Sequence, residues 1–184
     1  AIVHAAGSED QTRSHFEAQD LMEHGGLFGG GWLGRFLRTR PRESSSALTA
    51  VAVGRTLPEC LLGAPSATVM QSPNDFALGT SGPGLRDELE RLYALEQGTL
   101  ATAGTNTFDA LRRLDAMRTA KYEPANGAKY EDGDEFSEGL MNVARLIKGD
   151  LGLEAASIDI GGWDSHFTQG TLIDQTLGRA LRPR

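Results

Sequence analysis

The stretch Leu48-Thr-Ala-Val-Ala-Val-Gly54 decides the fold class of this chain. Small and β-branched apolar residues that end in a glycine are typical of a buried strand. Similar runs at 1–6, 67–70 and 155–160 predict further strands. Helical patterns separate these runs. Such an alternation of strands and helices indicates an α/β protein whose sheet is mainly parallel.

The helical segments carry apolar residues three or four positions apart, which is the spacing of one helix face. Phe136, Leu140 and Ile147 belong to the apolar face of the helix that we expect to be the longest. Trp32 follows a glycine run and is expected to pack in the core. Helices are expected at 14–24, around 32–37, at 83–96, around 108–117, around 136–147 and from 168 onward.

Composition and charge narrow the class of protein. The 184 residues fit one domain with a sizeable core, and the formal charge of −7 is spread along the chain. The basic residues between Arg35 and Arg42 form a cluster too short for a nucleic-acid footprint, so we expect no nucleic-acid partner. No stretch approaches the roughly 20 consecutive apolar residues that a transmembrane helix requires.

Cys60 and the number of strands bear on the organisation of the chain. A single cysteine excludes an internal disulfide and a zinc site built from several cysteines, and Cys60 is expected to be a small buried apolar residue. Only four strands are expected, and a doubly wound sheet usually has more. The chain also starts in an expected strand and stops in an expected helix. We therefore expect residues 1–184 to form a single domain that is an incomplete part of a larger one.

Asp164 and His166 follow the strand expected at 155–160, after a glycine pair. Ligands of open α/β sheets gather beyond the carboxyl ends of the strands. In an extended stretch, residues two apart point to the same side, so this carboxylate and this imidazole can bind one divalent cation. His4 and Asp159 are the other candidates in strand-end positions. The alternative is structural: Asp164 caps the next helix and His166 hydrogen-bonds the backbone.

Ser14 lies where a helix is expected to begin, with Arg13 before it and His15 after it. A hydroxyl there sits at the positive end of the helix dipole, beside free backbone N–H groups, and this arrangement makes an anion site. Such a serine could attack a phosphoryl or sulfuryl centre if a metal ion or a base helped to remove its proton. The alternative is that Ser14 or Thr12 caps the helix.

Several blocks of the sequence go beyond these generic patterns. They are Arg13-Ser-His-Phe-Glu-Ala-Gln-Asp-Leu-Met-Glu23, Gly31-Trp-Leu-Gly-Arg-Phe36, Tyr122-Glu-Pro, Gly127-Ala-Lys-Tyr130, Ala144-Arg-Leu-Ile147 and Gly161-Gly-Trp-Asp-Ser-His-Phe-Thr-Gln169. In order and spacing they resemble the family called domain of unknown function 1501. The resemblance runs over nearly the whole chain, and its most specific part is the block that begins at Gly161.

The resemblance implies an alkaline-phosphatase/sulfatase-like fold, an α/β/α sandwich whose relatives hydrolyse or transfer phosphate and sulfate esters with bound metals. It implies that Ser14 stands at the position of the nucleophile. Arg13 and His15 would then flank a small anionic ester substrate. Asp164 and His166 would belong to the site of a divalent metal, in first place zinc.

The resemblance also has implications for location and for the alternatives. Family members usually carry a twin-arginine export signal, which implies a periplasmic or otherwise extracytoplasmic bacterial protein. Their further acidic strand ends and a later histidine loop do not appear here, so the implied metal site is incomplete in these residues. The alternative function is a catalytically silent binding module that keeps the fold. An exposed edge of a truncated sheet would favour self-association.

Overall fold

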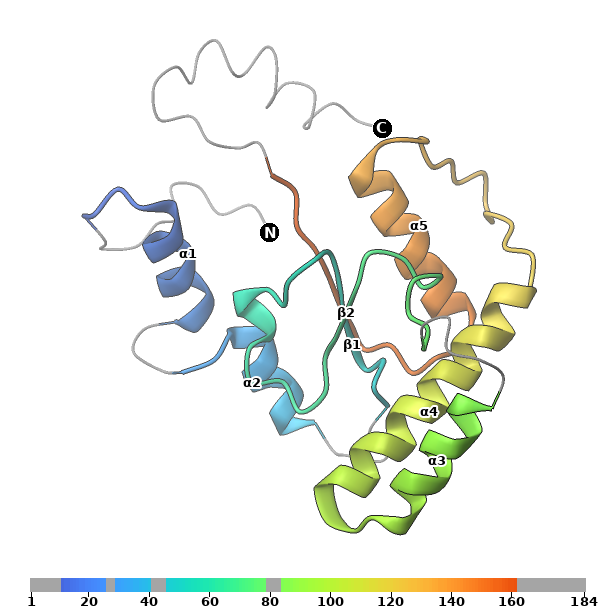
Figure 1. Cartoon of the computed structure of the whole chain (residues 1–184). Coiled ribbons are helices and arrows are strands. Elements are labelled where there is room, and N and C mark those ends of the chain that lie inside the picture. The colour runs from blue at the N-terminus through green and yellow to red at the C-terminus, as the bar shows by residue number, and fades with distance from the viewer. Residues whose placement is uncertain (1–10, 26–28, 41–45, 79–83, 162–184) are drawn as a thin grey trace.

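The computed structural model describes residues 11–25, 29–40, 46–78 and 84–161 (Figure 1). Its elements, in chain order, are α1 (His15–His24), α2 (Trp32–Thr39), β1 (Ala50–Val53), the short 3₁₀ helix η1 (Glu59–Leu61), β2 (Thr68–Met70), α3 (Leu85–Leu95), α4 (Gly98–Thr119), α5 (Glu135–Lys148) and β3 (Ala155–Ile158).

The described strands form one parallel sheet in the order β2-β1-β3. Val51 of the central strand is paired with Thr68 of β2 and with Ala156 of β3. The α/β class and the parallel sheet that the sequence predicts are therefore confirmed. The strand expected at 1–6 and the helix expected from 168 onward lie outside the described residues.

The first face of the sheet is covered by α2 and η1. Ala50 and Ala52 of β1 and Ala155 of β3 are buried there against Leu37 of α2 and Leu61 of η1. Small side chains on the strands let these short elements lie close to the sheet. Helix α1 contacts η1 and therefore stands on the same side, as Figure 1 shows to the left of the strands.

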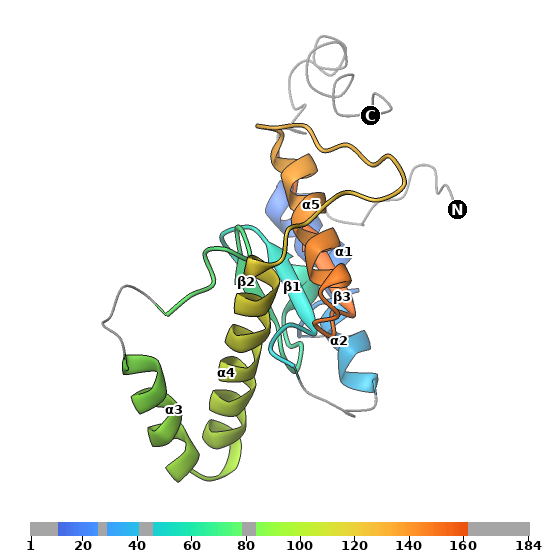
Figure 2. The same ribbon diagram turned by 90° about the vertical axis from the view of Figure 1, so that its right-hand side faces the viewer.

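The second face is covered by α4 and α5. Val51 of β1 and Met70 of β2 are buried there against Ala110 and Leu114 of α4 and Leu146 of α5. Helix α3 packs against α4 and stands away from the sheet (Figure 2). The sheet therefore lies between two helical layers, as expected when both faces of a parallel sheet must be buried.

Two expectations about the helices are wrong. Helix α4, with 22 residues, is longer than α5, with 14. Trp32 is 53% exposed, because α2 turns Gly34 and Leu37 toward the interior instead.

The buried face of α5 also differs from the one expected. The helix directs Gly139, Asn142 and Leu146 inward, and it leaves the apolar residues Phe136, Leu140 and Ile147 between 37% and 59% exposed. Gly139 faces β3 at close range, because a Cβ atom there would lie 3.0 Å from the Ile158 side chain. A larger residue at 139 would require the Ile158 side chain to shift, and the apolar pattern alone does not reveal this contact.

Two glycines at the start of α2 allow a backbone-to-backbone contact with η1. A Cβ atom on Gly31 would lie 2.0 Å from the carbonyl oxygen of Glu59, and one on Gly34 would lie 2.3 Å from that of Leu62. The Gly31 N–H donates a hydrogen bond to the same Leu62 oxygen at 3.1 Å. The glycine run therefore positions η1, and with it the segment that leads from β1 to β2.

Replacing Gly31 by alanine should lower the free energy of unfolding by about 1–3 kcal/mol, because the added methyl group has to displace the backbone of η1. Urea denaturation followed by circular dichroism measures this change. Gly54→Ala is the matched control, since a Cβ atom at Gly54 meets no atom within 4 Å. Equal stability of the Gly31 and Gly54 variants would contradict the close approach.

Candidate functional site

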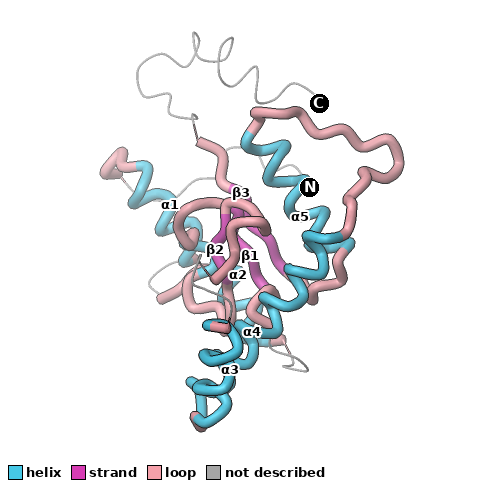
Figure 3. Tube along the Cα trace, turned by 45° about the vertical axis from the view of Figure 1, so that its right-hand side comes forward, coloured by secondary structure: helices cyan, strands magenta, loops and turns pink. Residues whose placement is uncertain are grey.

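The carboxyl ends of the three described strands lie at one edge of the sheet, because these strands are parallel (Figure 3). At this edge β1 leads to Gly54, β2 to Gln71 and β3 to Asp159. The N–H of Gly54 donates to the carbonyl oxygen of Met70 at 3.1 Å and so ties the first two ends together. This carboxyl edge is where open α/β sheets bind ligands.

Ser14 is the N-cap of α1. Its backbone is extended (φ −86°, ψ 124°), and its Oγ accepts a hydrogen bond from the N–H of Glu17 at 3.3 Å. Its own N–H donates to Thr12 Oγ1 at 3.1 Å. The capping role that the sequence left open is therefore present, while the role of Ser14 as a nucleophile stays a prediction.

Arg13 and His15 flank Ser14 at the solvent-exposed start of α1. Arg13 has a φ of 58°, in the left-handed region that non-glycine residues rarely adopt. No residue of α1 is buried, and Phe16 is 81% exposed. Within the described ranges, Ser14 is therefore a half-buried residue at the helix N-terminus, between the exposed side chains of Arg13 and His15.

Reactive side chains gather where α1, η1 and β3 meet, on the first face near the carboxyl edge. Cys60 Sγ lies 3.9 Å from Ser157 Oγ. Glu23 and Asp159 lie near enough to exert an electrostatic effect on the Cys60 thiol. One carboxylate oxygen of Glu23 is buried without a hydrogen-bond partner among the described residues. Sequence analysis singled out Asp159 and Cys60 here, but it gave no role to Glu23 or Ser157.

A hydrogen bond between side chains joins α1 to η1 beside this cluster. His24 Nε2 lies 2.9 Å from Glu59 Oε2, and both side chains are partly buried. This contact holds the carboxyl-terminal end of α1 against the 3₁₀ helix η1. It therefore holds the helix that Ser14 begins against the connection between β1 and β2.

Cys60 is half-buried, where the sequence led us to expect a buried residue. Burial raises the pKa of its thiol, and the negative charges of Glu23 and Asp159 raise it further, while the hydrogen bond with Ser157 acts in the opposite direction. A raised pKa keeps the thiol protonated and weakly nucleophilic at neutral pH. The interpretation of Cys60 as a structural cysteine, and not a reactive one, therefore agrees with its surroundings.

The predicted metal ligands are not all within the described part of the chain. Asp164, His166 and His4 lie outside the described residues, whereas Asp159 is exposed directly after β3. Among the residues that the structure does describe, no three His, Cys, Asp or Glu side chains come together as a metal site would require.

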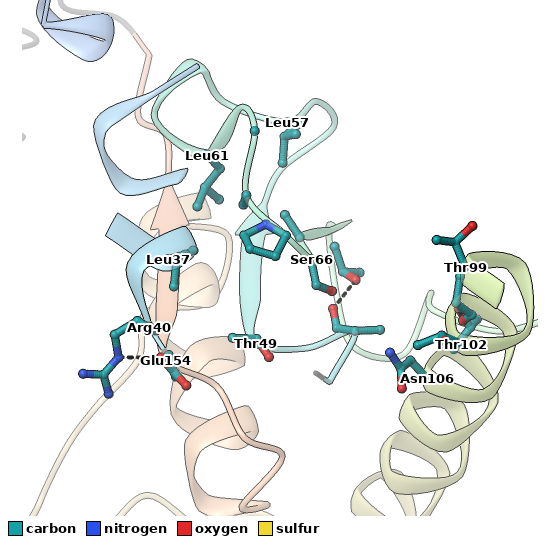
Figure 4. A pocket seen from close by; sticks show the side chains of 18 of the residues that line it. Leu37, Arg40, Thr49, Leu57, Leu61, Ser66, Thr99, Thr102, Asn106 and Glu154 are labelled. Atoms are coloured by element: carbon teal, nitrogen blue, oxygen red, sulfur yellow. Dashed lines mark hydrogen bonds and ion pairs between the residues drawn. The ribbon is translucent and has the colours of Figure 1, made fainter. Parts of the chain in front are cut away.

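A groove of about 1070 Å³ lies at the opposite end of the sheet (Figure 4). Thr49 and Glu154, which precede β1 and β3, line one side, and Thr102 of α4 lies on the facing wall. The two charged residues that line it, Arg40 and Glu154, pair with each other at 3.4 Å. Among the described residues that line the groove, the charged side chains are thus paired with each other, and we consider the carboxyl edge the better place for chemistry.

Two polar side chains that sequence analysis did not single out hold the loop after β2. Arg118 of α4 donates from Nε and Nη2 to the carbonyl oxygen of Pro73, at 3.1 and 2.7 Å. Asn142 of α5, which is 7% exposed, donates to the carbonyl oxygen of Gln71 at 3.2 Å. A lone asparagine within the apolar pattern of α5 was the only signal in the sequence for this contact.

Comparison with known proteins leaves the chain without an assigned relative: no family model, curated protein or solved structure matches it. Within the described ranges, no helix combines the length and the apolar character needed to cross a membrane. The sequence resemblance and the geometry of the carboxyl edge are therefore the basis for a functional proposal.

Glu23→Gln should make Cys60 more reactive, because removing a nearby negative charge lowers the pKa of the thiol. The rate of iodoacetamide alkylation, measured between pH 7 and 9, should rise several-fold over that of the slowly reacting wild type. Glu96→Gln, an exposed change in another helix layer, is the control. Identical pH profiles for the two variants would contradict the arrangement around Cys60.

Proposed function

We propose that this protein is a metal-dependent ester hydrolase of the phosphatase or sulfatase type, with Ser14 as its nucleophile. The observation that carries the proposal is the position of Ser14 at the exposed N-terminus of α1. Backbone N–H groups and the positive end of a helix dipole favour a bound phosphate or sulfate group at such a place. Arg13 and His15 supply further contacts to a small anionic ester.

The proposal assigns a divalent cation, in first place zinc, to Asp164 and His166. Both residues follow Gly161, where the described chain leaves the carboxyl edge beyond β3. A cation there would lower the pKa of a bound hydroxyl and stabilise the charge that develops on the ester. Asp159 is the described carboxylate nearest to these residues in the chain.

The family resemblance extends the proposal to fold and location. It adds an alkaline-phosphatase-like α/β/α sandwich of which this chain is a part, and export by a twin-arginine signal to the periplasm or another extracytoplasmic site. Self-association through an open sheet edge is part of the same proposal, since unpaired strand edges are templates for another chain.

A catalytically silent binding module is the second candidate function. It is favoured by the hydrogen bond from the Glu17 N–H to Ser14 Oγ, because a hydroxyl that caps a helix has a sufficient structural role. Such a module would keep the helix N-terminus as a site for an anionic group and would not turn over an ester.

Metal content separates the two functions. After dialysis, elemental analysis of the wild type should find about one or two equivalents of zinc or another divalent ion, the number that catalytic sites of this kind hold. Asp164→Ala and His166→Ala should each lose this metal, and Glu96→Ala should retain it. Folded wild type without metal would exclude the metallohydrolase and favour the silent module.

Ser14→Asn tests the nucleophile separately from the cap. Asparagine caps helices as well as serine does, so its stability should match that of the wild type, whereas Ser14→Ala should lose about 1 kcal/mol. If Ser14 is the nucleophile, both variants should lose hydrolysis of p-nitrophenyl phosphate and p-nitrophenyl sulfate. Activity that survives in Ser14→Asn would limit Ser14 to capping.

A further inference from the structure

A tetrapeptide occurs twice in the connection between α4 and α5. Ala120-Lys-Tyr-Glu123 is followed, eight positions later, by Ala128-Lys-Tyr-Glu131. The connection lies beside α5, at the right of Figure 1. The proposed function gives neither tyrosine a role, so the repeated segment calls for an explanation of its own.

A tight turn separates the two copies. Asn126 and Gly127 have φ values of 57° and 73°, and the Ala128 N–H donates across the turn to the Ala125 carbonyl oxygen at 3.1 Å. Positive φ at both central positions is the mark of a type I′ turn, for which Asn-Gly is a preferred pair. The turn therefore reverses the chain between the first copy and the second.

The two tyrosine side chains meet across this turn. Tyr122 Oη and Tyr130 Oη are 3.3 Å apart, and both residues are half-buried. A phenol hydroxyl can donate one hydrogen and can also accept, so the pair has two hydrogens and uses one of them between the two oxygens. The second hydrogen is left for another acceptor, and the residues that the structure describes provide none.

Arg145 of α5 completes the cluster. The hydrogen bond with Tyr130 raises the pKa of Tyr122, and the positive charge of Arg145 acts in the opposite direction, so this guanidinium lies within electrostatic range of the hydroxyl pair. Arg145 Nη2 also donates to Asn74 Oδ1, in the loop after β2, over a long 3.4 Å. The cluster therefore joins α5, the connection before it and the loop after β2.

Arg145 differs from the arginines of α4 in its pairing. Arg112, Arg113 and Arg118 each form an ion pair with an aspartate or a glutamate. Arg145 is half-buried and forms no ion pair with any other described residue. A guanidinium has five N–H donors, and the bond to Asn74 uses one of them. Most of its donors are therefore left to solvent or to a ligand.

We infer that Arg145, Tyr122 and Tyr130 form a binding site for a phosphate or sulfate group on the second face. Hydrogen bonds from a guanidinium to the oxygens of such a group are charge-assisted and strong. A tetrahedral anion has oxygens in several directions, so it can accept from α5 and from a tyrosine hydroxyl at the same time. Glu123, the neighbour of Tyr122 in sequence, pairs with Lys121 at 2.7 Å rather than with Arg145.

This site is separate from the one proposed around Ser14. Helix α1 contacts η1 on the side of the first face, whereas α5 covers the second face (Figure 1). The inference therefore goes beyond the proposed function and does not rest on it. It assigns to this cluster the binding of an anionic group and no step of ester hydrolysis.

The tyrosine ring signals in nuclear magnetic resonance spectra report on this site directly. The chain has three tyrosines, and Tyr93, whose ring packs against Phe108 with centroids 5.8 Å apart, is the internal reference. In a sample with isotope-labelled tyrosine, inorganic phosphate added at constant ionic strength should shift the signals of Tyr122 and Tyr130 until they saturate. The signals of Tyr93 should stay in place.

Variants separate binding from general effects of charge. Arg145→Gln should weaken phosphate binding by about tenfold or more, because it removes a charged donor. Arg91→Gln, the same change at an exposed arginine of α3, is the matched control. Tyr122→Phe keeps the ring and removes the hydroxyl, so it should weaken the phosphate response of Tyr130 several-fold.

Signals of Tyr122 and Tyr130 that do not respond to phosphate would overturn the inference, as would equal responses in Arg145→Gln and the wild type. An equal shift with chloride would overturn it too, because it would reflect ionic strength alone. Circular dichroism shows whether each variant is folded. Ser14→Ala should leave the response unchanged, so failure of the hydrolase proposal and failure of this site are distinguishable.

Discussion

The pairing of β1 with β2 on one side and β3 on the other is the constraint on which the rest of the structure depends. Because β1 is central, its side chains must be buried on both faces, and each face needs its own helical layer. Alanines at 50 and 52 serve the first face, and Val51 serves the second. The short elements α2 and η1 can lie against the small residues, while the longer α4 and α5 cover the face with larger ones.

The same constraint organises the candidate site. Parallel strands bring all their carboxyl ends to one edge, so the segments after β1, β2 and β3 are neighbours although they are far apart in sequence. The glycine contact of α2 with η1 then sets where Cys60 lies relative to Ser157. The hydrogen bond between His24 and Glu59 attaches the end of α1 to η1. Backbone contacts at the glycines of α2 and the His24–Glu59 contact thus hold α1, α2 and η1 together. The region around α1 buries few apolar side chains.

Much of the secondary structure could be predicted because hydrophobic periodicity is a local property. The strands predicted at 48–54, 67–70 and 155–160 appear as β1, β2 and β3, each within a few residues at its ends. The buried face of α5 could not be predicted, since it includes Gly139, which faces Ile158 of a distant strand at close range. The exposure of Trp32 was missed for a related reason. The contacts of Gly31 and Gly34 with η1, which decide the orientation of α2, are contacts of backbone rather than of apolar side chains.

By itself, the sequence determined the alternation of strands and helices, the parallel sheet and the start of a helix at Ser14, because each follows from propensity and spacing within a short stretch. Only the tertiary structure decided the order β2-β1-β3, the face that each helix covers, and the placement of Glu23 and Asp159 within electrostatic range of Cys60. These features depend on which distant segments pack together. Close approaches at particular glycines and pairings between strands select that packing, and neither leaves a periodic pattern in the chain.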